Sequence, residues 1–170
     1  MACWKVKLGD EIIHVCEIPE EEQSRRLEER RREWHPLLSR DGYIETWRRK
    51  FIHKGIAFEL AILRYYTLDD GFTTMYGRVS DRHVVVEYPE ETKPLVKMLE
   101  ELGVEDFLWH DTLRSWNDRQ TLPEQLEEAY RLAISDIDGL PKLLDEVIAN
   151  LKKKLKLAED LKRKVMEAGA

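Results

Sequence analysis

Glycine is scarce in this sequence, with eight among 170 residues. Enzymes that hold nucleotides on backbone amides use glycine-rich loops, and neither a phosphate-binding loop nor a dinucleotide fingerprint occurs here. The Gly-x-Ser-x-Gly turn that presents a nucleophilic serine is also missing. Most enzyme classes that sequence motifs reveal are therefore disfavoured, and we expect no cofactor.

Cysteine and histidine are sparse too, with two and five residues. The histidines never fall at the i, i+4 spacing that places two zinc ligands on one helix face, and no Cys/His knuckle is present. They are His14, His35, His53, His83 and His110. We therefore predict no metal site.

Long apolar runs are absent as well: none approaches the ~20 residues that a membrane span needs. Residues 1–5 lack the layout of a signal peptide, so we expect a cytoplasmic protein without a membrane partner.

Charged residues make up 36% of the chain, while Asn and Gln are rare. This composition is typical of proteins from thermophiles.

Charge is segregated along the chain, although the net charge is only −6. Residues 25–54 hold ten basic and five acidic groups, and residues 151–170 hold seven and three. Basic segments 25–54 and 151–164 therefore predict a nucleic-acid interface. The alternative is that basic and acidic segments face each other and cancel. The candidate phosphate contacts are Arg48, Arg49, Lys50, Lys54, Lys152, Lys153 and Lys154.

A β-hairpin is predicted over residues 1–18, where two alternating runs flank the Gly9-Asp10 loop. In this register, residues whose numbers sum to 19 face each other. Trp4, Val6, Leu8, Ile13 and Val15 then share the core face. Cys3 lies opposite Cys16 at a closely spaced pair, which makes a cross-strand disulfide a candidate; reduced thiols are the alternative.

The rest of the chain predicts an α+β fold that is mainly helical, in a single domain over 1–170. A helix begins after Pro19 and ends near residue 34, and a central helix covers about 43–66, where apolar residues recur at helical spacing. Strands over 72–79 and 83–88 form a two-stranded unit. Helices follow over 91–102, with Gly103 past its end, and over 123–134. Residues 104–116 fit either a short strand or helical turns.

The last predicted helix, over 139–168, is the longest element and can protrude from the domain. Its apolar residues alternate steps of three and four, which is a heptad-like stripe. They are Leu144, Val147, Leu151, Leu155, Ala158, Leu161 and Val165. Such a stripe needs cover, from the domain's own core, a second copy in a homo-oligomer, or another protein.

An Arg-x4-His spacing occurs at Arg30/His35 and at Arg48/His53. The second pair, in the predicted central helix, resembles the motif of the HEPN ribonuclease superfamily. The resemblance implies a metal-independent RNase site in which Arg48 stabilises phosphate charge and His53 acts as acid or base. Arg49 departs from the family's small polar residue after the arginine.

Residues 60–104 resemble one degenerate repeat of the LAGLIDADG homing-endonuclease family. A predicted helix ends at Asp69-Asp70-Gly71, two strands follow, and a second helix ends at Leu102-Gly103. The resemblance implies that Asp70 binds a catalytic divalent metal. Only Leu63, Asp70 and Gly71 agree by position, and Arg64 and Tyr65 replace the small residues of the family's helix interface. A plain helix-ending turn is the alternative.

These observations favour a non-catalytic interaction protein in a nucleic-acid-associated assembly. The competing hypotheses are a nuclease, either HEPN-like at Arg48 and His53 or metal-dependent at Asp70, and a purely structural or oligomeric protein.

Overall fold

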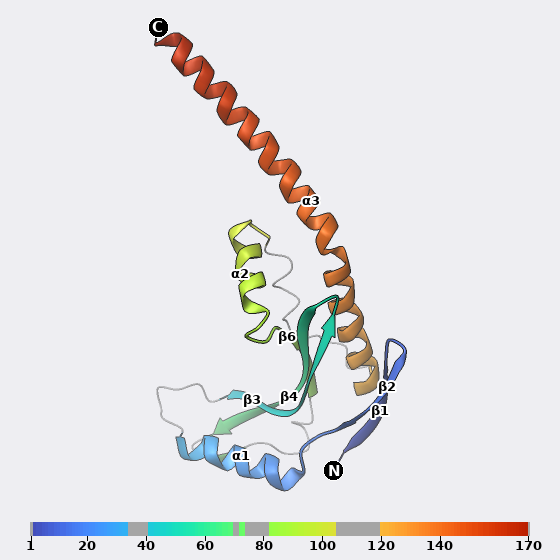
Figure 1. Ribbon diagram of the computed structural model, residues 1–170. Helices are drawn as coiled ribbons and strands as arrows, with labels where there is room; N and C mark the ends of the chain where they lie inside the picture. The colour runs from blue at the N-terminus through green and yellow to red at the C-terminus, as the bar shows by residue number, and fades with distance from the viewer. Residues whose placement is uncertain (1, 34–40, 70–71, 74–81, 105–119, 170) are drawn as a thin grey trace. The chain divides into compact units, whose positions relative to one another are not determined.

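The computed structural model describes residues 2–33, 41–69, 72–73, 82–104 and 120–169 (Figure 1). They form an α+β fold in which helices hold more residues than strands. The chain divides into two compact units, Met1–Ile134 and Ser135–Ala170, here called the first and the second unit. The expected strand or helical turns over 104–116 lie outside the described residues, apart from Val104.

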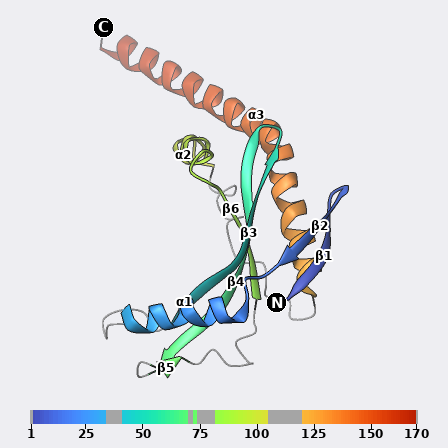
Figure 2. The same cartoon turned by 60° about the horizontal axis from the view of Figure 1, so that its bottom comes forward.

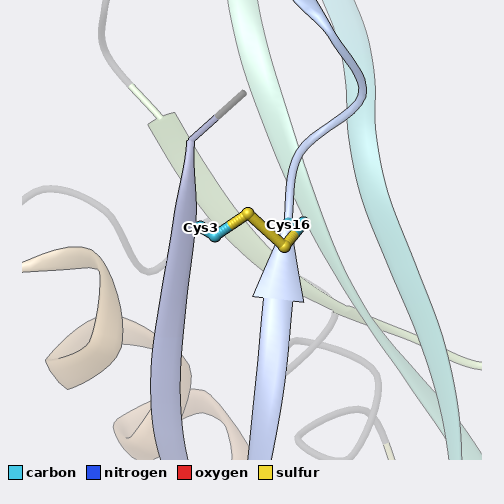
Figure 3. The surroundings of a disulfide bond; sticks show 2 residues. All are labelled: Cys3 and Cys16. Atoms are coloured by element: carbon cyan, nitrogen blue, oxygen red, sulfur yellow. A yellow bond between two sulfur atoms is a disulfide. The ribbon is translucent and has the colours of Figure 1, made fainter.

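The N-terminal hairpin has the predicted register. Strand β1 (Cys3–Leu8) pairs antiparallel with β2 (Glu11–Cys16), and Val6 faces Ile13. Gly9 has φ +62° in the connecting turn, a conformation that glycine adopts without steric cost. Val6, Leu8, Ile13 and Val15 are buried as expected, and a disulfide joins Cys3 to Cys16 (Figure 3).

Helix α1 (Glu20–Glu33) confirms the helix predicted after Pro19. Three glutamates occupy its first turn and three arginines its last turn, an order that complements the helix dipole. Its buried Leu27 packs in one cluster with Ile44 and Tyr66, so one face of α1 contributes to the core of the first unit.

The predicted central helix over 43–66 is wrong: these residues form strand β3 (Asp41–His53) and strand β4 (Ile56–Asp69). The turn at Lys54 and Gly55 explains the difference, because both residues have positive φ, 50° and 78°, as a tight two-residue hairpin turn requires. Ile56, Phe58, Leu60 and Ile62 also alternate with a period of two. Apolar residues lie on both faces of this sheet, and together they recur every three or four positions, which is also the spacing of a helix.

Strand β4 is the centre of the larger sheet. It pairs antiparallel with β3, with β5 (Phe72–Thr73) and with β6 (Arg82–Glu87). For the described residues, the predicted two-stranded unit near 72–88 is therefore corrected, because β5 and β6 each extend the β4 sheet. Residues 74–79 of the first expected strand lie outside the described residues. Figure 2 shows β3, β4 and β6 running side by side.

The core of the first unit includes residues on both faces of this sheet, since Ala61 and Val85 on the other face are buried too. Phe58, Leu60 and Ile62 of β4 are fully buried, as is Val84 of β6. Tyr130 adds its ring beside Phe51 and Phe58, with centroids 5.4 and 5.8 Å away. Helix α2 (Lys93–Glu101) buries Leu99, and Gly103 just past its end has φ +79°, as predicted for a helix-ending glycine.

The two helices expected over 123–134 and 139–168 are one helix, α3 (Leu122–Ala168). Thr121 caps its start: the Glu124 amide donates to the Thr121 hydroxyl at 3.3 Å, and that hydroxyl donates to the Glu124 carboxylate at 2.9 Å. Gly139 and Pro141 do not interrupt it, although Pro141 lacks the amide that would complete one helical hydrogen bond. Among the described helices, none is long and apolar enough to cross a membrane.

Candidate nucleic-acid and protein interfaces

Four of the five arginines of α1, all except Arg30, are paired with acids of the same helix. Arg25 contacts Glu22 at 2.5 Å and Glu29 at 2.7 Å, and Arg31 contacts Glu28 at 2.5 Å. The spacing of three and four residues places these side chains on one face. The hydrogen bond from Arg25 lowers the pKa of the Glu22 carboxyl, and Arg31 lowers that of Glu28 in the same way. The positive charge of this segment is therefore largely neutralised within the helix.

Arg48 lies at the centre of a four-residue ion-pair cluster on the sheet. Its guanidinium contacts Glu45 at 2.8 Å, Glu59 at 2.5 Å and Glu87 at 2.6 Å, from strands β3, β4 and β6. The hydrogen bond to Glu45, followed by those to the other two carboxylates, raises the pKa of Arg48 above its ordinary value. With three carboxylates around one cation, this cluster carries net negative charge and would repel a phosphate.

The neighbours of Arg48 are engaged in the same way. Arg49 lies 3.8 Å from Glu11 of the N-terminal hairpin, and Lys50 forms an ion pair with Glu91. Lys54 lies in the β3–β4 turn. The basic groups of Arg48, Arg49 and Lys50 therefore face acidic groups of other segments, which is the alternative to an exposed nucleic-acid interface.

The residues that carried the nuclease resemblances are not brought together. Arg48 and His53 lie on β3, five residues apart, so they point to opposite faces of the sheet. Residues 63–69, expected to end a helix before the metal-binding acid, belong to strand β4. Asp70 itself lies outside the described residues. Among the described residues, no three His, Cys, Asp or Glu side chains are close enough to hold a metal.

A buried polar cluster connects the hairpin to the sheet, and sequence reasoning did not find it. Glu17, only 1% exposed, receives a hydrogen bond from the Thr46 hydroxyl at 2.6 Å and pairs with Arg82 at 2.7 Å. The Arg82 guanidinium also lies 5.2 Å from the centre of the Trp4 ring. No local pattern marks these partners, because Glu17 and Arg82 are 65 residues apart in the chain.

Arg64 lies directly across from Arg82 in the β4–β6 ladder. It donates to the Gln23 side chain at 2.9 Å, and its Nε has no hydrogen-bond partner. Burial, and then the positive charge of Arg82, lower the pKa of Arg64. Glu17 partly offsets the repulsion between the two guanidinium groups. The cluster thus joins α1, through Gln23, and the residue after β2, Glu17, to the sheet.

The second unit differs from the first in both its apolar and its basic side chains. Leu151, Leu155 and Leu161 are 48, 60 and 62% exposed on α3. Lys152, Lys153 and Lys154 are exposed too, and no carboxylate among the described residues lies within ion-pair distance of them. The sequence explains this, because every neighbour three or four positions away from these lysines is apolar, Asn or Lys.

The chain matches no known family model, and neither a curated protein nor a solved structure is similar to it.

Proposed function

We propose that this chain is a non-catalytic interaction protein that works through the second unit. The observation that carries the proposal is an exposed apolar stripe beside exposed, unpaired lysines on one helix. Exposed apolar surface of this kind marks interaction sites. The first unit buries the apolar residues of its core, although Ile12 and Ile52 are exposed. Most of its described arginines form ion pairs, which suits a scaffold better than a contact surface.

The second part of the proposal is that the partner assembly contains nucleic acid. Lys152, Lys153 and Lys154 support it, because ammonium groups without a protein counter-ion are free to contact phosphates. Arg48, Arg49 and Lys50 do not, since each already contacts a carboxylate. The basic segment 151–164 therefore replaces segment 25–54 as the favoured nucleic-acid interface.

The test is binding of the full chain to labelled single-stranded RNA and to duplex DNA across a salt series. We expect binding that weakens steeply with salt, because phosphate contacts release counter-ions. The variant Lys152→Gln/Lys153→Gln/Lys154→Gln should abolish most of it. A matched control, Arg25→Gln/Arg31→Gln/Arg32→Gln, removes the same charge from ion-paired positions and should bind nearly as well as the wild type.

The same samples separate the competing functions on gels of intact substrate. Cleavage that survives a chelator and disappears in His53→Ala would establish the HEPN-like alternative. Cleavage that requires Mg²⁺ and disappears in Asp70→Asn would establish the metal-dependent one. Absence of binding at low salt would remove nucleic acid from the proposal and leave a protein partner.

A further inference from the structure

We infer that the second unit associates with a second copy of itself as a parallel two-stranded coiled coil. This inference rests on the proposed function, for which it names the partner. A regular heptad register runs along the exposed side of α3, with steps of three and four residues. Its d positions are Leu144, Leu151, Ala158 and Val165, and its a positions are Ile148, Leu155 and Lys162.

These positions are available for a partner. Ile148, Leu155 and Val165 are 48, 60 and 64% exposed. A β-branched residue at the first a position with leucines at d favours two strands. The single charged residue, Lys162 at an a position, tolerates this place in a dimer because its stem packs while its ammonium reaches water. A lysine at one a position also helps to specify the register.

Charge complementarity selects the second copy and its direction. In a parallel pair, a g residue of one helix lies beside the following e residue of the other. Lys154 occupies g and Glu159 the next e, so two opposite-charge pairs form, one on each side of the two-fold axis. In the dimer Lys154 is then engaged, and Lys152 and Lys153 remain for phosphate. Within one helix these residues are too far apart in sequence to pair.

The next g and e positions support the same direction. They are Leu161 and Met166, 62 and 66% exposed, which would contact each other across a parallel dimer and extend its apolar seam. In the antiparallel arrangement that pairs Lys152 with Glu159, Leu161 would instead lie beside Lys154 of the second copy, and Met166 beside Asp145. The parallel arrangement therefore buries apolar against apolar side chains.

The first experiment measures the mass of the full chain by sedimentation over a concentration series, with two matched leucine variants. Leu155→Lys places a charge in the seam and should weaken association roughly a hundredfold or more. Leu157→Lys makes the same change at position c, outside the seam, where Leu157 is 70% exposed, and should leave the dimer intact. A wild-type chain that is monomeric throughout, or equal loss in both variants, would overturn the inference.

The second experiment tests the direction. Glu159→Lys should weaken the dimer roughly tenfold, and adding Lys154→Glu should restore it, because the pairs are re-formed with exchanged charges. Rescue by Lys152→Glu instead would show the antiparallel arrangement and overturn the parallel one. Ala158→Cys in a Cys3→Ser/Cys16→Ser background should form an intermolecular disulfide on oxidation, since d positions face each other only in parallel register.

Failure here is distinguishable from failure of the proposed function. A monomer that still binds nucleic acid through Lys152–Lys154 would overturn self-association and keep the interaction function. Leu155→Lys and Leu157→Lys add the same charge beside these lysines but only the first weakens the dimer, so comparing the two on the same RNA and DNA separates the two readouts.

Discussion

The two units differ in how they place many of their apolar and basic side chains. In the first unit, Phe58 and Leu60 are fully buried, and Arg25, Arg31 and Arg48 contact carboxylates. In the second unit, Leu155 and Leu157 are exposed, and Lys152–Lys154 have no acid within reach among the described residues. The difference comes from neighbours rather than from composition: a basic segment becomes an available charge only where no acid stands at the right distance.

The largest test of this comparison is truncation of one apolar side chain in each unit. Phe58→Ala removes a ring that is 0% exposed and should lower the free energy of unfolding by about 3–5 kcal/mol, because a cavity remains. Leu157→Ala should change it by less than about 0.5 kcal/mol. Urea unfolding followed by tryptophan fluorescence and circular dichroism measures both, and a large effect of Leu157→Ala would show that the second unit is covered.

The next test removes one cation from each unit. Arg48→Gln leaves Glu45, Glu59 and Glu87 facing one another and should cost about 2 kcal/mol at pH 7, a value already reduced because solvent reaches the cluster. Lys153→Gln should cost less than about 0.5 kcal/mol. Lowering the pH protonates the carboxylates and removes attraction in the wild type and repulsion in the variant. The difference between them should therefore narrow in acid; a difference that stays constant would contradict the ion-pair account.

Two glycines give effects of opposite sign. Gly55→Ala forces a side chain into a positive-φ turn and should destabilise the first unit by about 1 kcal/mol. Gly139→Ala lies inside α3, where an added Cβ meets nothing within 4 Å, and should stabilise the helix by about 0.5–1 kcal/mol. Thermal unfolding followed at 222 nm compares the two, and destabilisation by Gly139→Ala would indicate that the helix is interrupted there.

The smallest expected effect is on one exposed carboxyl. Because Arg25 lowers the folded-state pKa of Glu22, the pair stabilises the fold above the ordinary pKa of a glutamate, and this contribution is lost as the pH falls through the lowered value. Arg25→Gln should return the Glu22 pKa towards its ordinary value, as measured by NMR titration. An unchanged pKa would show that the ion pair does not persist in solution.

Local signals predicted the parts of this fold that depend on neighbours in sequence. The hairpin register, the start of α1 and the glycine after α2 follow from turn and capping residues. The prediction of a central helix was wrong because apolar residues on both faces of a sheet can also recur at helical spacing. The Lys54-Gly55 turn is the local signal that divides this segment into two strands. Glu17, Arg82 and the acids around Arg48 come from distant elements, so no spacing rule could have paired them.

The tight turn at Lys54 and Gly55 has a consequence for the order in which the chain assembles. Strands β3 and β4 are joined by two residues, so the hairpin can form in about 1–10 μs without closing a long loop. Strand β6 pairs with Glu59–Arg64 only after residues up to Glu87 exist, across a longer connection. On the ribosome, where synthesis takes on the order of seconds, we expect the β3–β4 hairpin to be complete first and to act as the template on which β6 is added.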